Sequence, residues 1–372
     1  MLVGAAPACG GGTVRRRLGF ALVALLAGLA VLEGVARTLP EDAVQARGIV
    51  MPPHATRAWT LQTPEGPRPL YRATADGLRR PADAGDRGAP LVLTTGDSSI
   101  FGDGIDDGET LHDRIQQGLL AVGLPARGAT LAVPGYSTEQ TLAVLDDVGW
   151  DMAPRALVVG NLWSDSNTER LRDRDLLAAS SSLPGRAELF LARTAAFRQL
   201  RARINAARGL PARRKVTWPV LAARGMRRVP LGDYAHNLAA ILGEARRRGV
   251  GVVVLALAND EMLRGSAQAA PWTPYVDVQA RTAEAFGVPL VRAVDVFAGT
   301  PPTSVLRDNL HPNGSGQRML AEAVVATLRA AGWPDRLPVP READAVAIGE
   351  DPWDGRERPN ERSAVRDVLE AD

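Results

Sequence analysis

Short apolar runs alternate with helical patterns over most of the chain, and this alternation is the feature that most constrains the fold. Strands that are apolar throughout and separated by helices predict a parallel sheet covered on both faces. We therefore expect a three-layer α/β/α domain that binds ligands at the carboxyl ends of its strands. The predicted strands are 91–95, 129–133, 156–162, 250–257 and 289–291, and the predicted helices are 111–122, 138–148, 233–248, 276–286 and 314–331.

Composition argues against several classes of protein. The 372 residues carry a formal net charge of only +2 and few aromatic side chains, so we expect no binding to nucleic acid. The single cysteine, Cys9, can form no intramolecular disulfide, and the chain has four histidines without a His-Glu-x-x-His run. We therefore expect neither a metal site nor a cofactor.

The N-terminus has the pattern of a membrane-targeting segment. Three arginines at 15–17 precede an apolar stretch over residues 18–36. Because cationic flanks stay on the cytoplasmic side, residues 1–17 are predicted to be cytoplasmic and the rest to lie on the periplasmic side. A signal anchor, that is, one transmembrane helix, is favoured over a cleaved signal that would leave a secreted protein. A buried core helix is the other alternative, but the arginines disfavour it.

Three further segments lie outside the alternating pattern. Residues 37–89 are rich in Pro, Gly and charged residues and are predicted to be a linker, while residues 332–372 are predicted to be a disordered tail. Residues 166–229 are predicted to be an insertion in the domain that spans residues 90–331.

The insertion is strongly basic. Between Arg186 and Arg228 the sequence has eleven arginines and one lysine against one acid, Glu188. Apolar side chains recur at helical spacing within it, with most arginines on the remaining face. One interpretation is a helical hairpin packed on the domain with a solvated charged side, and the other is a surface that contacts anionic lipid or an acidic polymer. The apolar positions are Leu189, Phe190, Phe197, Leu200 and Ile204.

Two short segments far apart in the chain hold groups that can carry out nucleophilic chemistry. Ser98 follows the first predicted strand, and Asp308 and His311 lie in the loop before the last helix. A serine hydroxyl becomes a nucleophile when an imidazole takes its proton, and a carboxylate orients that imidazole. Each segment alone also fits a common turn or a surface histidine beside an acid. The glycines around Ser98 form neither a dinucleotide nor a phosphate-binding motif, nor a Gly-x-Ser-x-Gly elbow.

Together the two segments resemble the SGNH hydrolases, also called GDSL esterases and lipases. Gly96-Asp97-Ser98 matches the first block of that family, with Ser99 in place of the usual leucine, and Asp308-x-x-His311 followed by Pro312 matches the last. The resemblance covers residues 90–331 and implies a flavodoxin-like parallel sheet. It also implies a Ser98, His311, Asp308 triad.

In that family a glycine amide and an asparagine side chain complete the oxyanion hole, which usually carries a large share of the rate. Gly135, after the second predicted strand, fits the glycine. The family pattern Gly-x-Asn-Asp is irregular here, because the chain has Asn161 directly after Gly160 and then Ser164 before Asp165. The residue type slightly favours Asn161 as the side-chain donor of the oxyanion hole. The position of Ser164 directly before Asp165 keeps Ser164 as the alternative donor.

The resemblance implies an ester hydrolase of the cell envelope, either an esterase or lipase or a carbohydrate deacetylase. An O-acyltransferase that acts on an envelope glycan is the alternative within the same chemistry, and a non-catalytic envelope binding protein is the alternative outside it. The implied partners are an acyl-ester substrate, either a lipid or an acylated glycan, and the membrane.

Overall fold

The computed structural model describes residues 11–38, 60–63, 66–69, 88–169, 172–181, 183, 187, 190–191, 194–207, 226–269 and 271–343. The chain divides into two compact units. One unit is Met1–Ile49 with Leu176–Val216, and the other is Val50–Asp175 with Thr217–Asp372.

The larger unit contains a five-stranded parallel sheet in the order β4-β3-β5-β8-β9. This is the flavodoxin-like order 2-1-3-4-5, so the predicted fold class is confirmed. All residues of β3, β5 and β8 are buried, as expected for strands covered on both faces. The strands are β3 (Leu91–Gly96), β4 (Arg127–Thr130), β5 (Ala156–Gly160), β8 (Gly251–Ala256) and β9 (Leu290–Arg292).

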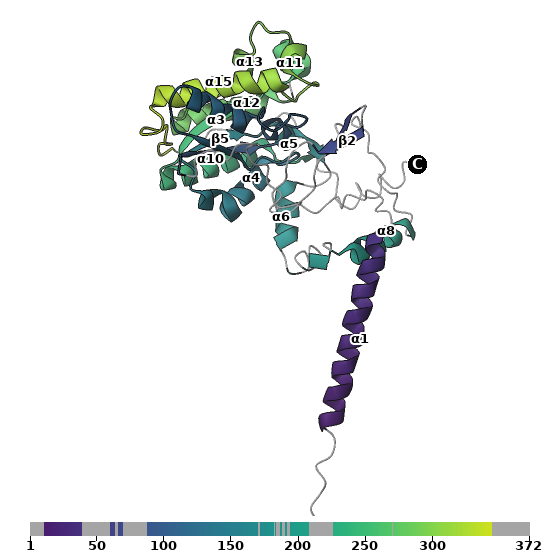
Figure 1. Cartoon of the computed structure of the whole chain (residues 1–372). Helices are drawn as coiled ribbons and strands as arrows, with labels where there is room; N and C mark the ends of the chain where they lie inside the picture. The colour runs from purple at the N-terminus through teal and green to yellow at the C-terminus, as the bar shows by residue number, and fades with distance from the viewer. Residues whose placement is uncertain are drawn as a thin grey trace, which may run out of the picture. The chain divides into compact units, whose positions relative to one another are not determined.

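Helices cover both faces of this sheet and make the three layers (Figure 1). Because side chains alternate along a strand, Val92, Val158 and Val253 pack with α3 and α15 on one face. Leu93, Leu157 and Val252 pack with α4 and α10 on the other. The main helices are α3 (Leu111–Ala121), α4 (Thr138–Val144), α10 (Leu231–Arg248), α12 (Thr273–Phe286) and α15 (Gly314–Ala331).

Short helical turns follow several strands, and α2 and α5 among them carry residues of the candidate site. A π-helical turn (Leu145–Gly149) and a 3-10 turn (Trp150–Met152) extend α4 toward β5. A second 3-10 turn (Ala267–Ala269) precedes α12. The remaining short helices are α2 (Ser98–Phe101), α5 (Trp163–Ser166), α11 (Asp260–Leu263), α13 (Ala293–Val296) and α14 (Pro302–Val305).

The two ends of the predicted insertion meet in a short antiparallel ribbon. Thr168 of β6 (Thr168–Glu169) pairs with Arg227 of β7 (Met226–Arg227). The chain therefore leaves the domain and returns to it at one place. Within the insertion the structure contains α6 (Asp173–Ser181) and α8 (Ala195–Ala207), whereas Leu189 lies outside the described residues.

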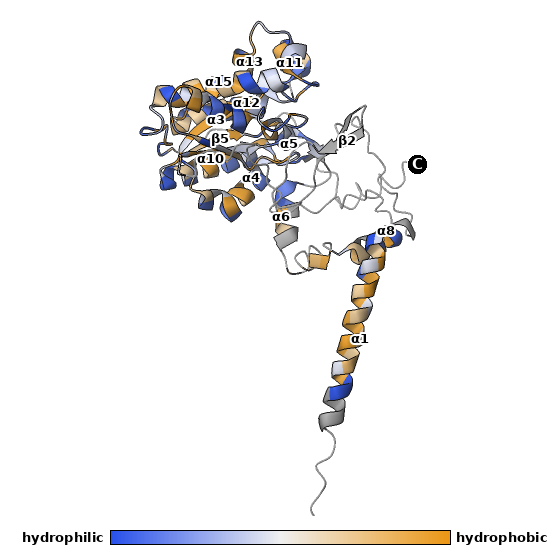
Figure 2. Cartoon of the chain, viewed as in Figure 1, coloured by the Kyte–Doolittle hydropathy of each residue, from blue (hydrophilic) through white to orange (hydrophobic). Residues whose placement is uncertain are grey.

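The smaller unit contains α1 (Gly11–Thr38), which is longer than the predicted span 18–36. From Arg16 to Thr38 it is long and apolar enough to cross a membrane, a property that a signal sequence shares. Figure 2 shows apolar residues along most of its length.

The structure adds a hairpin to the predicted linker and corrects the start of the predicted tail. Within the predicted linker 37–89, strands β1 (Thr60–Thr63) and β2 (Gly66–Pro69) form an antiparallel hairpin, and most of the other linker residues lie outside the described part of the chain. The predicted tail 332–372 begins too early, because residues 332–343 pack on the domain. Trp333 is buried and donates from its indole to the carbonyl of Pro125, and Val252 donates its amide to Pro338. Residues 344–372 lie outside the described part of the chain.

Candidate active site

The candidate site lies at the carboxyl ends of β3 and β5. From β3 the chain continues to β4 at one edge of the sheet, and from β5 it continues to β8 toward the other edge. Ligands bind at this kind of switch point in open α/β sheets. Gly96 and Gly160 end the two strands as direct neighbours. Gly96 has a φ of +154°, and a Cβ atom there would stand 2.4 Å from the carbonyl oxygen of Gly160. Close contact between the strand ends therefore requires glycine at position 96.

Ser98 is the first residue of α2, and the residue before it caps that helix. The carboxylate of Asp97 accepts from the amide of Ser99 (3.0 Å), as side chains of this type do at helix N-termini. This cap turns the chain sharply after β3 and leaves Ser98 half-buried at the edge of the sheet. Its backbone amide donates no hydrogen bond to any of the described residues.

Asp97 also joins this turn to the loop after β5. Its Oδ2 accepts from the amides of Leu162 (3.3 Å) and Trp163 (2.9 Å). Burial raises the pKa of the Asp97 carboxyl, although the amides of Ser99, Trp163 and Leu162 oppose this shift. Asp97 thus ties together two loops that border the site.

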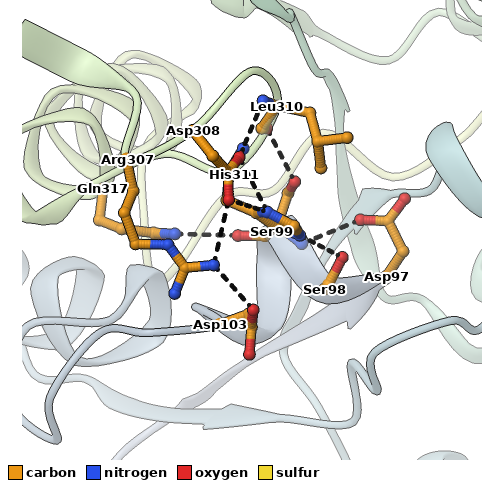
Figure 3. Close-up of polar contacts among 9 residues, drawn as sticks. All are labelled: Asp97, Ser98, Ser99, Asp103, Arg307, Asp308, Leu310, His311 and Gln317. Atoms are coloured by element: carbon orange, nitrogen blue, oxygen red, sulfur yellow. Dashed lines mark hydrogen bonds and ion pairs between the residues drawn. The ribbon is translucent and has the colours of Figure 1, made fainter. Parts of the chain in front are cut away.

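His311 lies between Ser98 and Asp308 (Figure 3). Its Nε2 is 2.8 Å from Oγ of Ser98, and its Nδ1 is 2.8 Å from Oδ2 of Asp308. An ionised carboxylate can only accept, so Nδ1 carries the proton and Nε2 accepts from the serine hydroxyl. This is the tautomer that a general base needs.

Asp308 is held in its ionised form. Partial burial raises its pKa, but hydrogen bonds from the amides of Leu310 and His311 and from the His311 ring outweigh that effect. The pKa of Asp308 therefore lies well below its usual range. Arg307 donates to Oδ2 of Asp308 (3.2 Å) and to Asp103 (2.9 Å), so one guanidinium joins this carboxylate to the loop after α2.

Several contacts fix the loop that carries His311. Its ends pair through a bridge between Leu306 and Pro312, in which the amide of Arg307 donates to the carbonyl of His311 (2.8 Å). Ser99 donates from its hydroxyl to the carbonyl of Leu310 (3.2 Å). The same hydroxyl accepts from the indole of Trp163 (3.0 Å). Ser99 therefore connects two loops of the site.

Gly135 lies in the loop after β4, the strand next to β3, and has a φ of +86°. Its carbonyl accepts from Arg228 (2.9 Å), which also pairs with the carboxylate of Asp173 (2.7 Å). Its amide donates to none of the described residues. An added Cβ would meet nothing within 4 Å, so the side of Gly135 that a Cβ would occupy is open.

Asn161 and Ser164 are both buried in the loop after β5. The side chain of Asn161 donates to the carbonyl of Tyr136 (3.4 Å) and accepts from Thr141 (3.2 Å). Asn161 thereby lies against the loop that holds Gly135. Ser164 is in α5, directly before Asp165.

Asp165 is a fully buried carboxyl beside this loop. Its Oδ1 accepts from the amide (2.8 Å) and the hydroxyl (2.6 Å) of Thr138, and its Oδ2 has no hydrogen-bond partner in the described part of the chain. Burial raises the pKa of Asp165 to about 7, against the opposing effect of Thr138.

This arrangement can transfer a proton from Ser98 to His311 while Asp308 stabilises the imidazolium. No group of three or more metal-ligating side chains occurs in the part of the chain that the structure describes. Sequence reasoning missed Arg307, Ser99 and Trp163 as site residues. The available signals were a charged residue directly before Asp308 and a serine at position 99, where the resembled proteins usually have leucine.

Comparison with known proteins gave matches among solved structures alone. No protein-family model and no curated protein matches the sequence. The chain is similar to a lipase/acylhydrolase from Enterococcus faecalis at 15% identity and a TM-score of 0.43, over 65% of this chain and 96% of that one. It is also similar to the acetylxylan esterase Axe2 from Geobacillus stearothermophilus at 15% identity and a TM-score of 0.42, over 66% and 95%. A putative lipolytic protein of the G-D-S-L family from Desulfitobacterium hafniense DCB-2 matches at 9% identity and a TM-score of 0.40, over 64% and 99%. These values are too low to transfer an activity or a substrate.

Proposed function

We propose that this chain is a serine-dependent ester hydrolase. One observation carries the proposal: His311 faces the hydroxyl of Ser98 with one ring nitrogen and the carboxylate of Asp308 with the other, each at 2.8 Å. These are the distances at which a nucleophile and its base exchange a proton.

In the proposed reaction Ser98 Oγ attacks the ester carbonyl and His311 takes its proton. The imidazolium, paired with Asp308, then protonates the leaving alkoxide as the carbon–oxygen bond breaks. Water then gives a proton to His311 and attacks the acyl carbon. The bond between that carbon and Ser98 Oγ breaks, His311 returns the proton to Ser98, and the acid leaves. Arg307 and the amides of Leu310 and His311 keep Asp308 ionised throughout.

The proposed oxyanion hole uses the backbone amides of Ser98 and Gly135, which donate to none of the described residues. Either Asn161 or Ser164 adds a side-chain donor. Asn161 has the support of its contact with the carbonyl of Tyr136, next to Gly135, because an amide group has a second hydrogen to donate. Loss of the correct side chain should lower kcat by about 100-fold to 1000-fold, and loss of the other should change kcat little.

We also propose that the protein acts at a membrane, with α1 as a signal anchor and the hydrolase domain on the periplasmic side. The arginines at 15–17 and the exposed apolar surface of α1 support this location. An acyl ester of a lipid or of an envelope glycan fits such a position.

The test is turnover of a short-chain chromogenic ester by the full chain in mild detergent. Ser98→Ala should lower kcat by at least about 1000-fold and abolish fluorophosphonate labelling. Ser304→Ala, which removes an exposed hydroxyl from α14, is the matched control and should retain both. Equal turnover by wild type and Ser98→Ala would contradict the proposal. Adding an acylated glycan and a glycan acceptor, with product masses measured, separates hydrolysis from acyl transfer.

A further inference from the structure

The smaller unit exposes several large apolar side chains besides those of α1. Outside α1, eight large apolar side chains are exposed among the residues with described side chains, and five of them belong to this unit. Contiguous exposed apolar surface marks a site of contact with a membrane or a partner. The five are Leu183, Phe190, Leu191, Leu200 and Ile204.

A specific contact joins α8 to α1. Glu33, near the carboxyl end of α1, accepts at Oε1 from the amide of Ala195 and at Oε2 from the amide of Ala196, each at 3.0 Å. These amides are the first of α8, where the helix dipole favours a negative charge. Arg37 donates to the same carboxylate (2.9 Å). Glu33 therefore serves as the N-terminal cap of a helix more than 160 residues away in sequence.

The position of Glu33 in α1 sets its depth in a bilayer. Arg17 and Glu33 are 16 residues apart, which is about 24 Å along a helix. A hydrocarbon core is about 30 Å thick, so Glu33 lies about 6 Å inside the far boundary of the core when Arg17 lies at the near one. A carboxylate there is costly unless polar groups satisfy it. Arg37 and the N-terminus of α8 provide those groups, so the N-terminus of α8 must then lie at the same depth.

The exposed side chains of α8 suit this depth. Leu200 and Ile204 are one helical turn apart and both exposed, and they form an apolar strip on α8. Arg203 beside them is exposed as well, and its long side chain can reach the headgroups while its stem covers apolar surface. Figure 2 shows apolar and polar residues together on α8, in contrast to the apolar α1.

We propose that α8, together with Leu183, Phe190 and Leu191, lies in the boundary between headgroups and acyl chains of the bilayer that α1 enters, and that Glu33 holds it there. The inference rests on the proposed membrane anchor. The occupant of the apolar strip is lipid, since α8 is bonded at its N-terminus to the apolar helix α1 and an exposed arginine accompanies the strip. The chain then contacts the membrane through two segments, α1 and the insertion.

The test measures the depth of single fluorescent labels in liposomes of zwitterionic and anionic lipids. The full chain with Cys9→Ser has no cysteine, so Leu200→Cys, Leu26→Cys and Leu120→Cys can each carry one environment-sensitive dye. Leu26 lies in the middle of α1, and Leu120 is an exposed apolar residue of α3 in the other unit. Lipids with a quencher near the headgroup or deep in the acyl chain report the depth of each dye.

We expect the dye at Leu200 to be quenched about threefold or more above the dye at Leu120, and more by the shallow quencher than by the deep one. The dye at Leu26 should respond most to the deep quencher. Glu33→Leu should reduce quenching at Leu200 while it leaves quenching at Leu26 unchanged. Glu322→Leu, which replaces an exposed glutamate of α15, should change neither.

Quenching at Leu26 without quenching at Leu200 would overturn the inference and leave the anchor intact. A blue-shifted but unquenched dye at Leu200 would also overturn it, because protein and not lipid would then cover α8. If no dye is quenched, the proposed anchor fails together with the inference, whereas ester turnover remains a separate measurement.

Discussion

Arg307 donates from Nη2 to Oδ2 of Asp308 across 3.2 Å, and this is the carboxylate oxygen nearer to Nδ1 of His311. The negative charge of Asp308 is therefore shared among the guanidinium, the imidazole and the amides of Leu310 and His311. Asp103 holds the guanidinium from the other side at 2.9 Å. The position of Asp308 beside the proposed general base thus depends on a residue that bonds Asp103 and Asp308.

Arg307→Gln should lower kcat by a few-fold. The guanidinium joins Asp308 to Asp103, so its loss frees the carboxylate that orients the imidazole of His311. Because these groups are partly exposed, we expect only a small effect. Ester turnover at saturating substrate measures kcat.

Arg318→Gln removes an exposed arginine from α15 and is the control for Arg307→Gln. Its kcat should match that of the wild type. An unchanged kcat in Arg307→Gln would show that Arg307 does not help to position the proposed base.

Ser99→Ala should lower kcat more than it changes KM. The Ser99 hydroxyl bonds both the carbonyl of Leu310 and the indole of Trp163, so its loss frees the loop that carries His311. It also leaves a buried indole N–H unsatisfied, at a cost of about 1 to 3 kcal/mol. We expect kcat to fall about tenfold, measured with ester turnover and thermal unfolding on the same sample.

A double-mutant cycle with Trp163→Phe checks the cause. If Ser99 acts through the indole, the two substitutions should be non-additive by about 0.5 to 3 kcal/mol in unfolding free energy. Additive effects would show that Ser99 does not act through the indole of Trp163.

The sheet was predictable because its strands are continuous apolar runs. A run such as Val252 to Leu255 is typical of a strand whose two faces are both covered by helices. The last helix was predicted to the residue because Asn313 caps its start and Gly332 ends it. The tail boundary was missed because the proline-rich sequence after Trp333 has no periodicity. Its contacts with Pro125 and Val252 depend on tertiary structure alone.

The candidate site shows the same division. Ser98, Asp308 and His311 were predicted from local motifs, and the structure brings them within hydrogen-bond distance. Arg307 was not predicted, because its place depends on Gly104, more than 200 residues away. A Cβ at Gly104 would overlap the guanidinium of Arg307. A local sequence pattern does not predict which residues far apart in the chain must share one volume.

Gly96→Ala should destabilise the domain severely. The φ of +154° disfavours any side chain, and the added Cβ would lie 2.4 Å from the backbone oxygen of Gly160, which cannot move without breaking the β3–β5 pairing. We expect a loss of about 3 kcal/mol or more in the free energy of unfolding, measured by denaturant titration. Gly243→Ala on α10 is the control, since a Cβ there meets nothing within 4 Å, and it should raise stability by about 0.5 to 1 kcal/mol. Equal stability of Gly96→Ala and wild type would refute the steric argument.

Asp165→Asn should remove a component of the pH dependence of stability. Burial raises the pKa of Asp165 from 3.8 to about 7 in the folded protein, so between these values the folded state holds a proton that the unfolded state has released. Stability therefore falls as the pH rises through this window, and the penalty is complete above about pH 7. Between pH 5 and pH 8 the wild type should lose about 2 to 3 kcal/mol relative to Asp165→Asn. Denaturant titrations at several pH values measure this difference. Asp277→Asn, at an exposed position of α12, should follow the wild type, and parallel curves for wild type and Asp165→Asn would show that Asp165 is ionised in the folded protein across the whole range.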